Sequence, residues 1–240
     1  KDTKFKPKYI NHQPKKMIEY DFDININQKK NYFSVEEARF LFGKELARKE
    51  TFIINSNNRK NIIVVGAPKT GIPSGKGFAE FLDIKYYQLF SKRKNEGRSF
   101  ILPDNKTRIK QIEKKFIFDE LIDLENKIIF LIDDSIVRGN TIKYIIKKLK
   151  EYKPKEIHIR ISSPQVKFPC YYGIDIPTSN ELLVNNISLE QFIIDNGIDS
   201  LVYLKEDEII LPLKKLFKDY SNKNYCTGCF NGKYLKELEF

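Results

Sequence analysis

The chain has 240 residues and a formal net charge of +11, and its 41% hydrophobic and 13% aromatic residues are ordinary for a globular protein of one domain with appendages. No apolar stretch approaches the roughly 20 residues that span a bilayer, and the polar N-terminal segment lacks the apolar core of a signal peptide. We therefore expect a cytoplasmic protein with no membrane partner, and because the lysines are scattered we expect no nucleic-acid partner either.

Residues 1–32 differ from the rest of the chain. They are rich in Lys and Asn and show little periodicity, which indicates an N-terminal arm or the remnant of a linker. Because the chain begins with Lys1 rather than Met, we expect it to be a piece of a longer protein. The pattern changes after Phe33, where Ser34 and Glu37 form a capping box ahead of the apolar spacing of VEEARFLFGKELARKE, and this predicts a helix.

From about residue 60 to 204 the chain alternates between strand and helix. The clearest segments, in the order strand, helix, strand, strand, helix, strand, are residues 61–68, 74–83, 84–90, 127–133, 141–152 and 156–163. Such alternation predicts an α/β fold in which a mostly parallel sheet is flanked by helices, and we place this domain at 33–205. We expect a further helix at about 106–120, and at 206–240 a C-terminal helix with a Cys-x-x-Cys segment packed on the domain.

Two acidic residues follow the strongest predicted strand. Asp133 and Asp134 come directly after its apolar run, at the carboxyl end where parallel sheets bind ligands. The next residues supply two hydroxyl groups, a glycine and the start of a helix, and exposed backbone N–H groups at such a start suit a phosphate. Carboxylates suit vicinal hydroxyls and hydrated Mg²⁺. The motif therefore predicts a magnesium-assisted site for a sugar phosphate, with a simple helix cap as the alternative.

The stretch IIFLIDDSIVRGNT (128–141) resembles the signature of the type I phosphoribosyltransferases, and within it DDSIVRG resembles that of the amidophosphoribosyltransferases. The similarity continues, in the same order as in that family, through 97–103, 158–178 and 226–234. The resemblance implies the type I phosphoribosyltransferase fold with a flexible active-site loop. It also implies transfer of ammonia to C1 of phosphoribosyl pyrophosphate, which gives 5-phosphoribosylamine and pyrophosphate in the first step of de novo purine synthesis.

The resemblance further implies roles for the acid motif and for a loop after the first strand. Asp133 and Asp134 would hold the ribose hydroxyls and Mg²⁺. The 5'-phosphate would be wrapped by Ser135, Ile136, Val137, Arg138, Gly139, Asn140 and Thr141. The pyrophosphate would meet Lys69, Thr70 and Gly71. Their turn suits an anion, but the family usually has an acidic residue where Lys69 stands.

The basic stretch 91–108 corresponds to the family's flexible loop, which closes over the substrate and excludes water. Lys92, Lys94 and Arg98 would neutralise the leaving pyrophosphate, with Lys92 and Arg98 as catalytic groups. Asn95 stands where the family tends to have Tyr. A solvated basic loop is the alternative.

Three cysteines offer a second test of the resemblance. Cys170, Cys226 and Cys229 match three of the four that hold a 4Fe-4S cluster in some family members, and the fourth would stand at Lys16 or Met17. A bound cluster, Zn²⁺ at the thiolates and no metal at all are the three alternatives.

No cysteine precedes Cys170, whereas family members begin with a glutaminase domain whose N-terminal Cys attacks glutamine. We therefore expect ammonia-dependent activity, with a glutaminase domain upstream or on another chain as a partner. The resemblance also implies a homo-oligomer and inhibition by purine nucleotides. Two alternatives stay open, namely a purine salvage phosphoribosyltransferase and a non-catalytic phosphoribosyltransferase-like regulatory module. His158, in a predicted strand, is expected to pack there rather than to catalyse.

Overall fold

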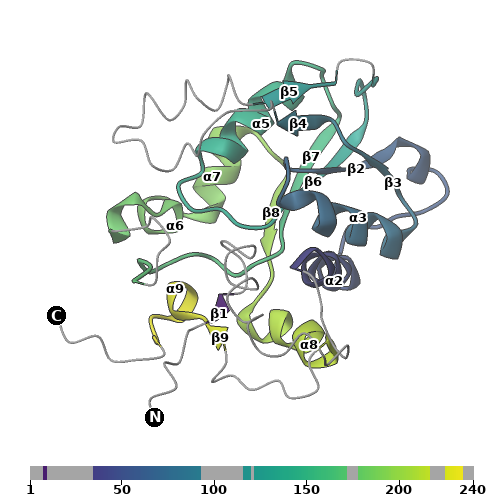
Figure 1. Ribbon diagram of the computed structural model, residues 1–240. Coiled ribbons are helices and arrows are strands. Elements are labelled where there is room, and N and C mark those ends of the chain that lie inside the picture. Colours follow the sequence, from purple (N-terminus) through teal and green to yellow (C-terminus); the bar gives the residue numbers. More distant parts are fainter. Residues whose placement is uncertain are drawn as a thin grey trace, which may run out of the picture.

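The computed structural model describes residues 8–9, 35–92, 116–119, 122–171, 178–216 and 225–234 (Figure 1). Within these residues five parallel strands form the main sheet, in the order β3-β2-β6-β7-β8. The strands are β2 (Ile62–Gly66), β3 (Lys85–Tyr87), β6 (Ile128–Asp133), β7 (Glu156–Ile161) and β8 (Ser200–Tyr203). The predicted α/β fold, a mostly parallel sheet flanked by helices, is confirmed.

Both faces of this sheet are covered, which explains why its central strands are continuous apolar runs. Successive side chains of a strand point to opposite faces, so Phe130 and Ile132 of β6 join one core and Ile129 and Leu131 join the other. The longer helices that contribute to the first core are α2 (Val35–Arg48), α3 (Gly71–Leu82) and α8 (Glu206–Leu216). The longer helices that contribute to the second are α5 (Asn140–Lys150) and α7 (Leu189–Asn196).

Helices α2 and α3 lie close together because glycines stand at their contact. A Cβ atom on Gly43 would lie 1.9 Å from the carbonyl oxygen of Ser74, and one on Gly77 would lie 2.0 Å from that of Phe40. Any side chain at either position would therefore push the helices apart. The helix predicted after Ser34 is confirmed as α2, and the helix predicted at 74–83 begins three residues earlier, at Gly71.

The order of strands fixes where a ligand can bind. From β2 the chain runs outward to β3, then crosses to β6 and continues outward to β7 and β8 on the other side. The direction of winding reverses between β2 and β6, and open α/β sheets bind ligands beyond the carboxyl ends of the strands at such a point. The register pairs Gly66 of β2 with Ile132 of β6, so the loops that follow these two strands begin side by side.

Two predicted segments differ from the structure. The strand predicted at 84–90 is divided, because β3 ends at Tyr87 and β4 (Phe90–Lys92) pairs antiparallel with β5 (Phe116–Phe118) instead of joining the main sheet. The helix predicted at about 106–120 is wrong over β5, which is a strand, and its earlier part lies outside the described residues.

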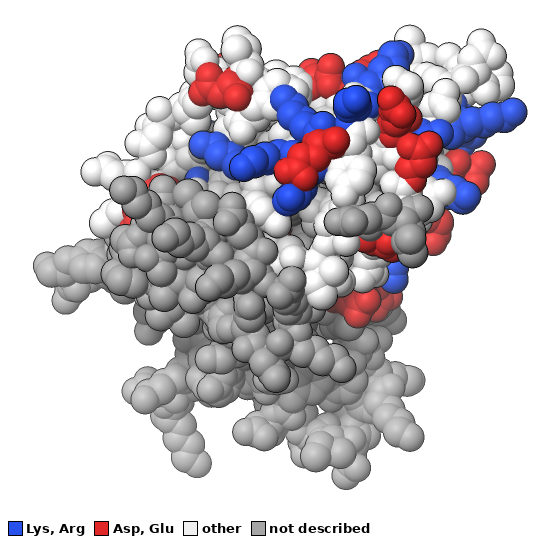
Figure 2. Space-filling view, turned by 90° about the horizontal axis from the view of Figure 1, so that it is seen from above, with Lys and Arg blue, Asp and Glu red and all other residues white. Residues whose placement is uncertain are grey.

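Short elements complete the described chain. They are β1 (Lys8–Tyr9), its parallel partner β9 (Tyr225–Cys226), α6 (Leu183–Asn186), α9 (Gly228–Asn231) and the 3-10 turns Arg59–Asn61 and Ser179–Glu181. Every helix in the described ranges is too short or too polar to cross a bilayer. On the described part of the face shown in Figure 2, basic and acidic side chains are interspersed.

Candidate active site

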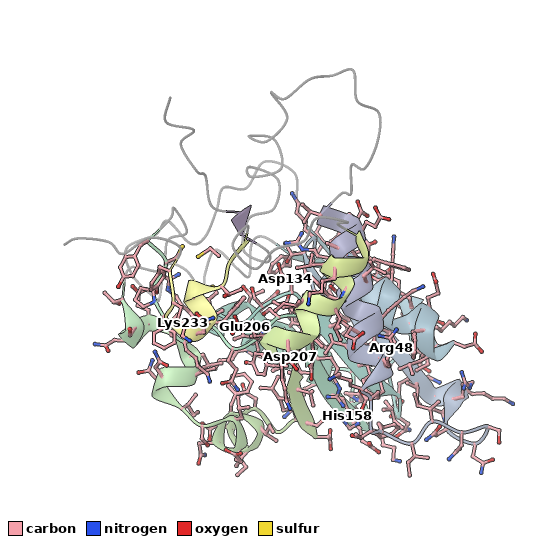
Figure 3. The ribbon with its side chains drawn as sticks, turned by 90° about the horizontal axis from the view of Figure 1, so that it is seen from below. Arg48, Asp134, His158, Glu206, Asp207 and Lys233 are labelled. Atoms are coloured by element: carbon pink, nitrogen blue, oxygen red, sulfur yellow. The ribbon has the colours of Figure 1, made fainter. Side chains whose placement is uncertain are left out.

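Asp133 and Asp134 lie at the carboxyl end of β6, beside the point where the winding reverses. Asp133 is the last residue of the strand, and the two residues are only 6% and 7% exposed. The backbone N–H of Asp134 donates to Oδ1 of Asp133 over 2.8 Å, which holds the first carboxylate in place. In the view of Figure 3, Asp134 lies between α9 and α2.

Arg39 of α2 supplies a charge partner for this acid pair. Its Nη2 atom lies 2.9 Å from Oδ2 of Asp134, and each side chain is 10% exposed. The pKa of Asp133 is raised well above its ordinary value, because burial withdraws water from the charged carboxylate and because the Asp134 charge repels it. Two acids thus share one buried cation, and a ligand that brings positive charge would relieve their repulsion.

The acid pair has the ligand chemistry that Mg²⁺ requires, because carboxylate oxygens are hard donors. In the described part of the chain, no group of three or more His, Cys, Asp or Glu side chains could hold a metal ion. Mg²⁺ commonly uses one or two protein carboxylates and completes its shell with water and substrate phosphates. Two acids therefore fit a magnesium ion that arrives with a phosphate-bearing ligand.

The loop after the acids leads into α5 and is held by contacts with Glu181 and Leu183. Gly139, just before α5, has φ +81°, and a Cβ there would lie 3.2 Å from the Leu183 side chain. Val137 O accepts from the Leu183 N–H over 2.8 Å, and Arg138 Nε donates to Glu181 Oε2 over 2.5 Å. Because the Arg138 guanidinium is engaged with Glu181, the loop can offer an anion mainly its backbone N–H groups and the start of the helix.

The loop after β2 contains a residue in a left-handed backbone conformation, which residues other than Gly seldom adopt. Lys69 has φ +70°, which costs a residue other than Gly about 1–2 kcal/mol. Thr70 precedes α3 without donating or accepting a side-chain cap bond, so no cap from that residue satisfies the first N–H groups of the helix. Such groups suit an anion, in agreement with the pyrophosphate role expected for Lys69, Thr70 and Gly71.

The two loops touch at Gly71. A Cβ atom on Gly71 would lie 2.4 Å from the carbonyl oxygen of Ile132 and 3.1 Å from the Cα of Asp133. The Ala67 N–H donates to the same Ile132 carbonyl over 2.7 Å. The structure therefore brings the predicted pyrophosphate residues and the predicted ribose acids together, at the reversal point of the sheet.

The structure does not describe the basic side chains of the predicted flexible loop. Lys92 ends β4, but its side chain lies outside the described set, and Lys94, Asn95 and Arg98 fall in a range that the structure does not describe. Their expected contact with the leaving pyrophosphate stays a prediction.

Three residues of the site were missed by sequence reasoning, namely Arg39, Ser74 and Ser162. Arg39 pairs with Asp134, while the two serines have no exposed surface and form hydrogen bonds with each other and with the carbonyls of Arg39 and Asp133. The one available signal was that Arg39 stands on the apolar face of a helix, four residues before Gly43.

The three cysteines gather around β9 and α9, and within the described ranges they form no metal-binding group. Burial raises the pKa of the Cys229 thiol, and the neighbouring Cys170 and Cys226 raise it further, so the thiols lie near one another. That electrostatic effect acts over longer distances than a metal–ligand bond, and the described residues form no three-ligand group. The fourth position expected for a cluster, at Lys16 or Met17, lies outside the described residues. The described chain does not support the iron–sulfur cluster.

A cavity of about 410 Å³ lies at the opposite end of the sheet, where β2, β3 and β6 begin. Side chains of both signs line it, among them Arg59, Lys85, Lys127, Asp83 and Asp123. None of the residues predicted to bind substrate contributes to its lining.

Comparison with known proteins identifies relatives of this chain. Residues 40–163 match the phosphoribosyl transferase domain family. The chain is 40% identical over 173 residues to an amidophosphoribosyltransferase of Synechococcus elongatus, covering 72% of this chain and 34% of that protein. It is 34% identical over 224 residues to one of Methanocaldococcus jannaschii, covering 93% and 44%. Its structure is similar to that of a glutamine phosphoribosylpyrophosphate amidotransferase from B. subtilis complexed with ADP and GMP, with a TM-score of 0.69 and 32% identity over 97% of this chain and 47% of that one. The chain thus spans less than half the length of these proteins.

Proposed function

Because this chain belongs to the phosphoribosyl transferase domain family, we propose that it transfers ammonia to C1 of phosphoribosyl pyrophosphate, giving 5-phosphoribosylamine and pyrophosphate. The type I phosphoribosyltransferase fold and the resemblance to amidophosphoribosyltransferases, both predicted from the sequence, are confirmed. The activity itself is inferred, since the relatives are about twice as long.

One observation carries the proposal. The loop at Lys69–Gly71 and the acids Asp133 and Asp134 meet at a single point of the sheet, and the start of α5 follows within six residues. A ligand bound there would face an anion-binding turn, a pair of carboxylates and a second anion-binding helix start. Phosphoribosyl pyrophosphate has the matching groups in that order, namely pyrophosphate, diol and 5'-phosphate.

In this arrangement the acids and the helix start have different tasks. The Asp133 and Asp134 carboxylates would accept hydrogen bonds from the ribose hydroxyls and would hold Mg²⁺, which neutralises charge on the leaving pyrophosphate when it is bound. As the bond from C1 to pyrophosphate breaks, positive charge develops on the sugar, and nearby carboxylates stabilise it. Ammonia donates its electron pair to C1 and then loses a proton. Backbone N–H groups at the start of α5 would hold the 5'-phosphate throughout.

Further parts of the proposal concern what surrounds this chain. We infer a glutaminase domain, upstream or on another chain, as the source of ammonia. The B. subtilis relative is described as complexed with ADP and GMP. We propose that purine nucleotides also bind this protein and inhibit it. We also propose the boundaries 1–32, 33–205 and 206–240 for the arm, the domain and the C-terminal segment, a homo-oligomeric state and a cytoplasmic location.

The test is pyrophosphate release from phosphoribosyl pyrophosphate and Mg²⁺ with ammonia, with purine bases and with neither. Release with ammonia, lost in Asp134→Asn, is the expected result. Release with bases alone would instead indicate purine salvage. Binding of phosphoribosyl pyrophosphate without any release would indicate a regulatory module.

A further inference from the structure

A pair of buried hydroxyl groups joins the two halves of the proposed substrate site. Ser74 lies on α3 and Ser162 directly follows β7, and neither has any exposed surface. Their Oγ atoms are 2.9 Å apart. Ser74 Oγ lies 3.0 Å from the carbonyl oxygen of Arg39, and Ser162 Oγ lies 3.2 Å from that of Asp133.

Two hydroxyl protons serve these three contacts. Ser74 donates to the Arg39 carbonyl, and Ser162 donates to the Asp133 carbonyl, so the contact between the two Oγ atoms shares one of these two protons. The Asp133 carbonyl already accepts from the backbone N–H of Ser162 over 2.9 Å. Ser162 is therefore bonded both to β6, the strand that carries the acids, and to α3, the helix that follows the proposed pyrophosphate loop at Lys69–Gly71.

This series of hydrogen bonds continues through Arg39 to the second acid, Asp134. Arg39 is held at its carbonyl by Ser74, and its guanidinium donates to Asp134 over 2.9 Å. A closed circuit thus runs from Asp134 through Arg39, Ser74 and Ser162 to Asp133, and it joins β6 and β7 to α2 and α3. All five residues are less than 10% exposed, so water cannot replace a lost partner easily.

The circuit reaches the pyrophosphate loop through α3. Ser74 stands one helical turn after Gly71, the first residue of α3, and Gly71 packs against the end of β6. A helix is rigid over one turn, so a bond that fixes Ser74 also fixes Gly71, the residue at which the loop of Lys69 and Thr70 enters α3.

We propose that Ser74 and Ser162 are positioning residues that set the distance between the pyrophosphate loop and the acid pair, so that both ends of one activated pentose are bound at once. This inference rests on the proposed function. A ligand that spans two subsites gains affinity only if they are held at its own spacing, whereas a ligand that fills one subsite is indifferent to that spacing.

Ser163 provides a matched control. It follows Ser162 directly and also has no exposed surface, but its hydroxyl donates to the carbonyl of Pro164 in its own loop, over 3.0 Å. Ser163→Ala therefore removes one buried hydroxyl at the same place in the fold without opening the circuit.

The experiment compares Ser74→Ala, Ser162→Ala and Ser163→Ala by titration calorimetry with Mg²⁺. Each is titrated with phosphoribosyl pyrophosphate, with pyrophosphate alone and with ribose 5-phosphate alone. For Ser74→Ala and Ser162→Ala, we expect affinity for the whole substrate to fall about ten-fold, while affinity for each fragment changes less than about two-fold. Ser163→Ala should leave all three affinities near those of the unchanged protein. Because Ala favours helices, Ser74→Ala should fold even if Ser162→Ala does not.

Equal losses for whole substrate and fragments, or equal effects of Ser162→Ala and Ser163→Ala, would overturn the positioning role while leaving the proposed function intact. If the unchanged protein bound neither the substrate nor its fragments, the proposed function and this inference would both fail.

Discussion

Arg39 and Asp134 stand 95 residues apart in the sequence and form an ion pair of 2.9 Å that is almost shielded from water. Removing both charges from water costs free energy, so such a pair contributes little net stability. Its value here is that it places a cation beside Asp134 at the end of a buried strand, next to the second acid, Asp133. The pair therefore serves the site more than the fold.

Arg39→Met should be costly, because it leaves the Asp134 charge buried without a partner. We expect the free energy of unfolding to fall by about 3 kcal/mol, measured by urea denaturation at neutral pH. Lys148→Met is the control, because its ion pair with Glu151 is 35% and 46% exposed on the two side chains. That variant should lose less than about 1 kcal/mol. Equal losses would mean that the buried pair contributes no more to stability than the exposed pair does.

Gly71→Ala should damage the site and the fold together. The added Cβ would lie 2.4 Å from the Ile132 carbonyl oxygen, so the pyrophosphate loop must move away from the acid strand. We expect a loss of about 1–3 kcal/mol in the free energy of unfolding, as for overpacked positions, and loss of phosphoribosyl pyrophosphate binding. Lys76→Ala, on the exposed side of the same helix, should change neither quantity. A Gly71→Ala protein of normal stability and affinity would refute the close contact.

A substitution of Lys69 tests whether its positive charge contributes to pyrophosphate binding. Its side chain is exposed, and its positive φ is one that Asn also adopts readily. Lys69→Asn should therefore keep the stability within about 0.5 kcal/mol but weaken pyrophosphate binding about five-fold, with a smaller dependence on salt. Calorimetry at two salt concentrations measures both effects, with Lys76→Asn as the control. Unchanged pyrophosphate affinity would show that the Lys69 ammonium does not contact the anion.

The fold and the acid motif were predictable because their signals are local. The apolar run before Asp133 and the helix periodicity after it can be read within a few residues. The pairing of β4 with β5 joins segments more than 20 residues apart, and no local pattern encodes that register. Ser74 and Ser162 gave no signal either, since a single small polar residue in an apolar stretch looks the same whether it is buried or exposed.

Cys229 should be chemically unreactive in the folded protein. Burial raises the pKa of its thiol, and the thiolate is the form that reacts with alkylating agents. In protein freed of metal by a chelator, iodoacetamide at neutral pH should label Cys170, which is less buried, faster than Cys229, as measured by peptide mass spectrometry. The difference should vanish in urea. Equal labelling rates in the folded state would contradict the buried position of Cys229.

His158 should make stability depend on pH. It stacks on Phe130 at 5.1 Å between ring centres, and its nitrogens lie 2.8 Å from Ser200 Oγ and 3.1 Å from Glu156 Oε2. Burial lowers its pKa below the ordinary value of 6.5. Below pH 6.5 the unfolded chain therefore binds a proton that the folded protein does not, and acid favours unfolding until the lower folded pKa is passed.

His158→Gln removes this titration while keeping a polar side chain at the position. In urea denaturation at about pH 7.5 and about pH 5.5, the unchanged protein should lose more stability on acidification than His158→Gln does. Asp133, whose pKa burial raises, and the other carboxylates are common to both proteins, so the difference between the two losses reports the imidazole. An equal loss in both would mean that His158 takes up its proton as readily in the folded protein as in the unfolded chain. That result would contradict its burial against Phe130.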